Sequence, residues 1–284
     1  MVVLIKKNFK LLVTMLLVLL ISIGKAQLIR GQLFDDEAKP IRYVNIGIVG
    51  KNVGTVSDQN GNFTIELRNQ FDKDTLKFST IGLKSLEFNV GDFKKEYLAA
   101  KTIQIKLEKS TTILKEITVK PKTFVMKTIG NTANSISIRG GFESNDLGTE
   151  VGTVMKMKIK KTPAFIENVN FNIAINEYDT LTFRINIYNM KNGLPYENIL
   201  PEPVFITALG KTRTLSLDMK QYNLIVEDDF FVSLEWIKEL KGKGLYFCGS
   251  TSKLGSFSKK TSQSSWQKED VLGLGFYTTV IYEK

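Results

Sequence analysis

The C-terminal half of the chain contains one dense group of acidic residues, and two carboxyl groups a few ångströms apart can hydrolyse glycosidic bonds. The group comprises Glu227, Asp228, Asp229, Glu235 and Glu239. Apolar residues alternate from Phe230 to Trp236, so Glu235 should point away from the core and towards solvent. We interpret the group as a solvated turn. The alternative is a histidine-independent carbohydrate-active enzyme that uses paired acids such as Asp228 and Asp229.

The chain contains no histidine, which removes the commonest general base and the commonest zinc ligand. No Gly-rich phosphate loop and no G-x-S-x-G motif occur either. The turn from Asp58 to Asn62 offers acid and amide oxygens, but its glycine spacing differs from that of an EF-hand loop. We therefore expect a protein that is not an enzyme and that uses no metal and no cofactor.

Aromatic side chains in polar surroundings are the candidate ligand-binding residues, because sugars stack on exposed aromatic faces. Trp266 lies in a run of serine, glutamine and lysine residues, where it either closes the end of a sandwich or is exposed for stacking. We favour the first alternative, in which Trp266 closes the end of the sandwich, because most tryptophans are substantially buried. Tyr188 and Tyr196 flank a predicted turn and are weaker candidates for the same role.

Residues 1–26 have the pattern of an export signal. Lys6, Lys7 and Lys10 precede an apolar run, and Ala26 provides a small residue for cleavage. The run is shorter than the roughly 20 residues that span a bilayer, so we expect removal of the segment and a mature chain that begins near Gln27. The protein should then be periplasmic, associated with the outer membrane, or extracellular.

The formal net charge of +10 includes four lysines of the predicted signal peptide, and without them +6 remains. Because much of this charge should lie on solvated strand faces, we expect no nucleic-acid partner. Cys248 is the single cysteine, which excludes an intramolecular disulfide. Its apolar neighbours predict a buried side chain.

Apolar residues recur at every second position through most of the mature sequence, which predicts an all-β protein. Residues 27–109 should form a seven-stranded Greek-key sandwich, in which Val44, Ile46 and Ile48 face Phe63, Ile65 and Leu67. Its expected strands are Leu28–Phe34, Arg42–Val49, Val53–Ser57, Asn62–Leu67, Thr75–Ser79, Lys84–Val90 and Thr102–Leu107. Residues 110–150 should form a linker, and residues 151–284 a jelly-roll-like β-sandwich.

The N-terminal region resembles the carboxypeptidase-regulatory-like domain, a transthyretin-like sandwich widespread in exported proteins of Bacteroidetes-type bacteria. The resemblance runs from Leu28 to about Lys109. It implies a non-catalytic module without the metal ligands of the peptidase. The matching residues are Gly31, Lys39-Pro40-Ile41, Val44-Asn45-Ile46, Gly54-Thr55, Ser57-Asp58, Gly61, Phe63 and Ser79-Thr80-Ile81-Gly82.

The following segment, Leu114 to Val119, is similar to the extension that leads to the plug in TonB-dependent receptors. Only about 160 residues follow this segment, which is too few for a receptor barrel. We therefore expect that the protein is not a transporter. The sequence predicts a binding or structural protein of the envelope, peripherally associated with the outer membrane, that engages a protein or a glycan. A further alternative is an accessory subunit that binds an outer-membrane receptor through strand edges of the first domain.

Overall fold

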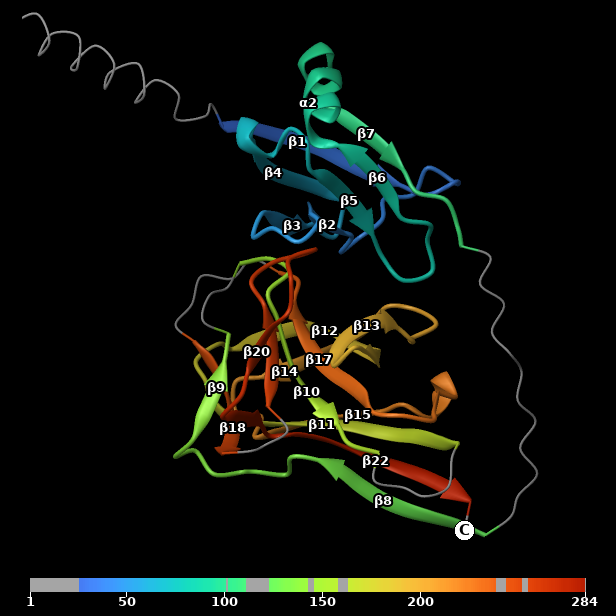
Figure 1. Cartoon of the computed structure of the whole chain (residues 1–284), viewed down its shortest axis with the longest axis vertical. Coiled ribbons are helices and arrows are strands. Elements are labelled where there is room, and N and C mark those ends of the chain that lie inside the picture. Colours follow the sequence, from blue (N-terminus) through green and yellow to red (C-terminus); the bar gives the residue numbers. More distant parts are fainter. Residues whose placement is uncertain are drawn as a thin grey trace, which may run out of the picture.

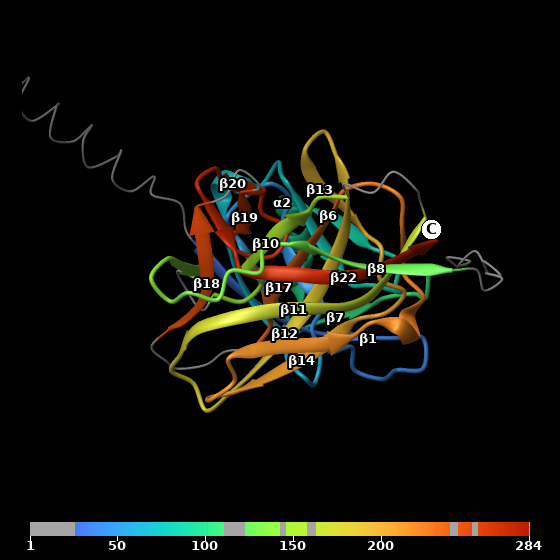
Figure 2. The same cartoon turned by 90° about the horizontal axis from the view of Figure 1, so that it is seen from below.

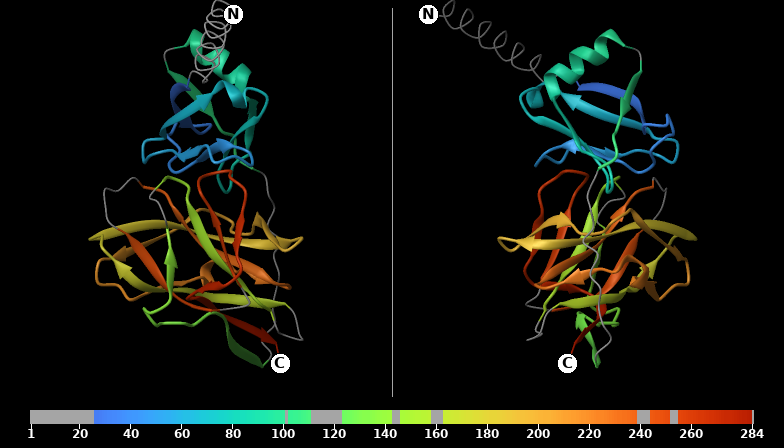
Figure 3. Two further views of the ribbon diagram at one scale, coloured as in Figure 1. Left: turned by 60° about the vertical axis from the view of Figure 1, so that its left-hand side comes forward. Right: turned by 90° about the vertical axis from the view of Figure 1, so that its right-hand side faces the viewer.

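The computed structural model describes residues 26–100, 102–110, 123–142, 146–157, 163–238, 244–251 and 255–283. These residues form two β-sandwiches stacked one on the other (Figures 1 and 3). The all-β prediction is confirmed. Residues 1–25 of the predicted signal peptide and the segment Leu114–Val119 lie outside the described residues. No helix within the described ranges is both long and apolar enough to cross a membrane.

The first sandwich consists, in the part of the chain that is described, of a three-stranded sheet in the order β4-β1-β7 and a four-stranded sheet in the order β3-β2-β5-β6. Strands β1 and β7 pair in parallel, and the other pairs are antiparallel. Each expected strand is found within a few residues of its predicted bounds. The strands are β1 (Ala26–Phe34), β2 (Asn45–Ile48), β3 (Gly54–Val56), β4 (Asn62–Arg68), β5 (Thr75–Ser79), β6 (Leu86–Asn89) and β7 (Ile103–Lys106).

The two sheets enclose a core to which the predicted faces contribute. The expectation for this core is confirmed, because the apolar side chains of residues 44, 46 and 48 and of residues 63, 65 and 67 are buried in one cluster. Phe78 lies within this cluster, fully buried, and its ring packs against those of Phe63, Phe88 and Phe93 at centroid distances of 5.6, 5.8 and 5.7 Å. Aromatic packing therefore ties both sheets to the neighbouring helix.

The helix α2 (Val90–Ala99) was not predicted from the sequence. Asn89 caps it, with the side chain accepting a hydrogen bond of 3.1 Å from the backbone N–H of Asp92. Val90, Phe93 and Tyr97 turn towards the core of the first sandwich. These three positions give too short a helical pattern to stand out beside the period-two signal of the strands.

The second sandwich pairs two antiparallel sheets, which among the described residues comprise seven and eight strands. The seven-stranded sheet faces the first sandwich, and the other sheet lies on the far side (Figures 1 and 2). The nearer sheet contains β10 (Glu150–Met155), β12 (Thr180–Lys191), β13 (Leu194–Asn198), β14 (Val204–Leu209), β17 (Phe230–Trp236), β19 (Ser256–Lys259) and β20 (Gln267–Glu269). The farther sheet contains β8 (Phe124–Gly130), β9 (Arg139–Gly141), β11 (Ala164–Asn176), β15 (Thr214–Asp218), β16 (Ile225–Val226), β18 (Leu245–Thr251), β21 (Leu272–Leu274) and β22 (Phe276–Glu283).

Strands β8 and β9 fall inside the segment 110–150 that was expected to be a linker. β8 pairs with β22 along its whole length, and β9 pairs with β18. β9 comes from the part of this segment that is rich in glycine and polar residues and resembles a loop in sequence. Both segments form strands because neighbouring strands supply the pairing partners. Two 3-10 turns, η1 (Asn69–Phe71) and η2 (Lys220–Tyr222), complete the described elements.

The core of the second sandwich contains Phe183, Trp236, Phe247 and Phe276, all at most 2% exposed. Cys248 is buried next to it, as expected, and burial raises the pKa of its thiol.

Replacing Phe78 with alanine should destabilise the first sandwich by about 3–5 kcal/mol, because the ring fills the centre of its core. Amide hydrogen exchange of β1 to β7 would measure the loss. The substitution Val49→Ala provides the control, since Val49 is 47% exposed. Equal protection in both variants would contradict this assignment of the core.

Candidate functional site at the interface of the two sandwiches

Four charged side chains form one row across the sheet of the second sandwich that faces the first. The strand registers place Arg184 on β12, Glu235 on β17, Glu150 on β10 and Lys259 on β19 directly opposite one another. The row therefore reads plus, minus, minus, plus. Like charges that lie directly opposite destabilise a sheet, so the two central glutamates require the flanking cations.

The geometry of this charged row supplies the required pairing. Nε of Arg184 donates to Oε2 of Glu235 at 2.8 Å, and Nζ of Lys259 lies 2.7 Å from Oε2 of Glu150. Nδ2 of Asn186 donates to both glutamates, at 2.9 Å to each. The hydroxyl of Ser233 donates to Oε1 of Glu150 at 2.5 Å. Buried charges persist in a protein only when they are paired and hydrogen-bonded in this way.

Burial and pairing act on the pKa values of the row in opposite directions. Burial alone would raise the pKa of Glu235, but the charge and hydrogen bond of Arg184, with help from Lys259 and Asn186, lower it. Burial likewise opposes the charge of Arg184, whereas Glu235 raises the pKa of its guanidinium. Burial and the charge of Glu150 raise the pKa of Tyr188 well above its usual value. The phenol therefore stays protonated and donates to Glu150 at 3.2 Å.

Arg184 also connects the charged row to the first sandwich. Its Nη1 donates to the carbonyl oxygen of Tyr43 at 2.6 Å, and its Nη2 donates to Oδ1 of Asn45. Tyr43 has a φ of 58°, which is an uncommon conformation for a bulky residue and directs this carbonyl to the arginine. Its ring packs on that of Phe205, at a centroid distance of 5.3 Å. One guanidinium thus links a buried carboxylate of one domain to the backbone of the other.

A loop at residues 261–265 of the second sandwich rests on the hairpin formed by β2 and β3. The backbone N–H of Gly50 donates to the carbonyl of Gln263 at 2.8 Å, and Nε2 of Gln263 donates to Oγ of Ser79 at 2.7 Å. A Cβ atom on Gly47 would lie 2.3 Å from the carbonyl oxygen of Ser262. Glycine at this position therefore permits the close approach of the two domains.

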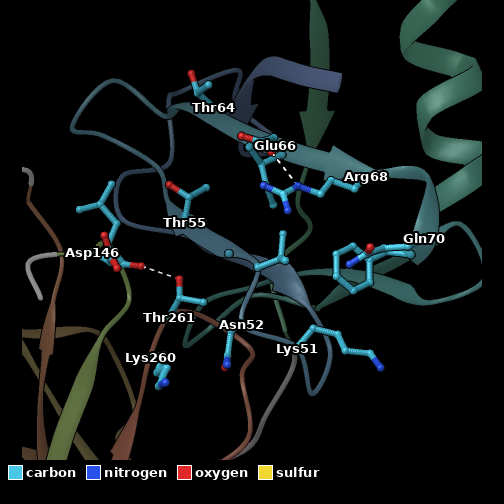
Figure 4. Close-up of a pocket in the computed structure, with 15 residues that line it drawn as sticks. Lys51, Asn52, Thr55, Thr64, Glu66, Arg68, Gln70, Asp146, Lys260 and Thr261 are labelled. Carbon is cyan, nitrogen blue, oxygen red and sulfur yellow. Dashed lines mark hydrogen bonds and ion pairs between the residues drawn. The ribbon is translucent and has the colours of Figure 1, made fainter. Parts of the chain in front are cut away.

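A groove of about 1060 Å³ opens where the two sandwiches meet. Thr64, Glu66 and Arg68 of β4 lie along one side, and Asp146 and Thr261 of the second sandwich lie opposite (Figure 4). Arg68 is paired with Glu66 at 2.9 Å. The remaining lining residues come from β4, from β3 and the turn before it, from η1 and from the second sandwich, and they are Lys51, Asn52, Val53, Gly54, Thr55, Ile65, Gln70, Phe71, Leu147 and Lys260.

The aromatic candidates occupy two different places. Trp266 is half-buried beside the charged row, where Nζ of Lys259 lies 4.3 Å from its ring centroid and its edge meets the rings of Tyr188 and Phe231. Tyr188 is half-buried in the same cluster. Tyr196 lies elsewhere, 52% exposed, with Nζ of Lys191 at 4.2 Å from its ring centroid. The structure therefore brings two of the three candidates together.

The acidic group identified in the sequence is not assembled into one site. Glu235 is 1% exposed, so the expectation that it faces solvent is wrong. It does point away from its own core, but the first sandwich covers that face. Asp229 is bound to Nζ of Lys156 at 2.6 Å and to the backbone N–H of Met157 at 2.8 Å. Glu227 and Asp228 are exposed, and Glu239 lies outside the described residues.

Asp58 uses its carboxylate to hold the turn from Asp58 to Asn62, whose acid and amide oxygens could suggest calcium binding. Its Oδ1 accepts hydrogen bonds of 2.8 Å from the backbone N–H groups of Asn60 and Asn62. In the described ranges of the chain, no group of three or more acid, cysteine or histidine side chains could hold a metal ion.

Glu150, Arg184, Asn186 and Lys259 were not singled out from the sequence. A signal existed in β12 and β17, where polar residues alternate with apolar ones but Tyr188 and Phe231 share their face. Large aromatic residues on the polar face of a strand indicate a face that is covered. The sequence gives no sign of which segment covers it.

Residues 29–119 match the family model of the CarboxypepD_reg-like domain. The first sandwich is therefore a domain of this family, which is a non-catalytic β-sandwich of regulatory or binding type. No curated protein matches the chain.

Replacing one member of the Arg184–Glu235 ion pair should destabilise the protein, and replacing both members together should cost less than the two single replacements added. Arg184→Met leaves Glu235 buried without its partner and should lower the free energy of unfolding by about 3–5 kcal/mol. The double variant Arg184→Met/Glu235→Leu should lose less than the sum of the two single variants. Tryptophan fluorescence in urea reports this transition, because Trp236 and Trp266 both lie in the second sandwich.

The control is Arg30→Met, which replaces an exposed arginine and should change stability by less than about 0.5 kcal/mol. Strict additivity of the two single substitutions would show that Arg184 and Glu235 are not coupled.

The interface should weaken in acid. Because the pKa of Glu235 is lowered in the folded state, its ionised form stabilises the protein above the ordinary glutamate value near 4.5. This contribution is lost as the pH falls through the lowered pKa. The stability advantage of the wild type over Glu235→Gln, measured in urea between pH 7 and pH 3, should therefore shrink as the pH falls. Glu227→Gln, at an exposed position, should show no such trend. An advantage that is independent of pH would contradict this account.

Proposed function

We propose that this protein is an exported, non-catalytic binding protein of the bacterial envelope, and that it holds a protein partner in the groove between its two sandwiches. The observation that carries the proposal is the groove itself. Its walls come from both domains, and the buried charged row holds these domains in one arrangement. Binding sites often form at domain interfaces, where two rigid surfaces meet.

The charged row is better suited to holding the domains than to catalysis. A glycosidase needs one protonated acid whose pKa is raised, whereas the pKa of Glu235 is lowered. Both central glutamates are at most 1% exposed and are occupied by cations and by the amide of Asn186. No substrate bond can reach such carboxylates without separation of the two domains. This argues against the carbohydrate-active alternative at this place.

A protein partner fits the site better than a glycan does. Trp266 and Tyr188, the stacking candidates near the interface, already pack against each other and against Lys259. Among the lining residues of the groove, Phe71 is the single aromatic one, and it is half-buried in the first core. The groove instead offers hydroxyl, amide and charged side chains beside a strand. The export signal predicted at residues 1–26 is the support for an envelope location.

Immobilised mature chain should retain a defined protein from envelope extract of the source organism, and it should give no signal on a glycan array. Lys260→Glu reverses a charge at the groove and should reduce retention several-fold. Lys211→Glu reverses another exposed charge of the second sandwich, outside the groove, and should leave retention unchanged. Turnover of a polysaccharide, or equal retention by both variants, would count against the proposal.

A further inference from the structure

We propose that the groove receives an extended, acidic segment of the partner polypeptide, which adds to β4 as a fourth strand of the three-stranded sheet. This inference deepens the proposed function and rests on it, because it states how the partner is held. It follows from four features of the first sandwich: unequal sheets, a long regular edge, the direction of backbone groups along that edge, and the charges around it.

The two sheets of the first sandwich differ in size at the place where the groove lies. In the described residues the sheet β3-β2-β5-β6 has four strands, and the sheet β4-β1-β7 facing it has three. The groove is lined by Thr55 of β3 and by Thr64 and Arg68 of β4, so it lies between the edges of both sheets. An added strand beside β4 would occupy this volume and give both sheets four strands.

The edge of β4 is long and regular. It pairs with β1 in an unbroken register from Asn62 to Arg68, with no bulge. Proteins usually protect a free edge by shortness, bulges, prolines or charges. Within β4, the ion pair of Glu66 with Arg68 is the one such device, and their side chains are 49% and 57% exposed. A solvated ion pair of this kind is easily displaced.

Backbone groups of alternate residues of β4 point into the groove. The N–H of Leu33 donates to the carbonyl of Gly61 at 2.9 Å, which continues the register of β1 with β4 by one pair. Hydrogen-bonded and non-hydrogen-bonded pairs alternate along an antiparallel ladder. Thr64, Glu66 and Arg68 therefore direct their N–H and C=O groups away from β1. The same three residues line the groove.

The side chains around the edge define the partner segment. One face of an added strand would continue the row of exposed side chains on β4, and the other would turn inwards towards Val53 and Phe71. The charged lining residues are Lys51, Arg68 and Lys260 against Glu66 and Asp146. The fitting segment alternates apolar and polar residues and carries acidic side chains on its polar face. Because walls surround the edge of β4, a single tail or loop of a partner fits there better than the sheet edge of a second folded copy of this chain.

A substitution can remove one donor of this edge without removing a bond to β1. Glu66→Pro deletes an N–H that points into the groove, and proline is tolerated at such edge positions. Glu66→Gln is the matched control, since it removes the same charge and keeps the N–H. The probe is the tightest-binding peptide selected from a random displayed library on the mature wild-type chain, then synthesised.

The selected peptide should alternate apolar and polar residues. Its affinity should fall at least tenfold for Glu66→Pro and less than threefold for Glu66→Gln. N-methylation of alternate peptide amides should abolish binding to the wild-type chain in one register and leave it unchanged in the other. This second measurement holds even if Glu66→Pro does not fold. Equal binding to both variants, or indifference to methylation in both registers, overturns the inference. If Glu66→Pro still retained the envelope partner, strand addition at β4 would be wrong but the proposed binding function would remain supported.

Discussion

The buried attraction between Arg184 and Glu235 is the constraint on which the arrangement of the two domains depends. The pair lies at 2.8 Å, with both side chains at most 3% exposed. Such burial is costly unless every charge is satisfied. The same guanidinium reaches Tyr43 and Asn45 of the first sandwich. Separation of the domains would therefore expose the row to water and remove two of the partners of the arginine.

This constraint explains how two small modules are held in one arrangement. Interfaces between domains of a chain often permit relative motion. Here the charged row, the ring of Phe205 against Tyr43 and the loop at Gln263 connect the domains at separate points. The walls of the groove are attached to this interface. A groove with fixed walls binds an extended segment with less loss of conformational entropy than a mobile one.

Paired buried carboxylates can serve in catalysis or in holding domains together, and the charged row shows how these two roles differ. In a catalytic dyad, the environment drives two pKa values apart so that one group remains protonated. Here the flanking cations and Asn186 favour the ionised form of Glu235. The two adjacent carboxylates, which could have been mistaken for an active site, are thereby assigned to domain association.

The order of residues alone was sufficient to predict the strands of the first sandwich and its family. Alternation placed the strands of the first sandwich and assigned the faces of Ile46 and Phe63, because burial of every second side chain is a property of the strand alone. It failed for β8, which was expected to belong to a linker and is held as a strand by its pairing with β22. It failed also for Glu235, which was correctly turned from its own core but was expected in water.

What covers the face that carries Glu235 depends on contacts between distant parts of the chain. Arg184 lies 139 residues from Asn45 in the sequence, so their contact leaves no local pattern. The row of Arg184, Glu235, Glu150 and Lys259 depends on the register of four strands, and a shift of one residue would send each side chain to the opposite face. Periodicity specifies which way a side chain points. The partner it meets there is specified by the packing of distant segments.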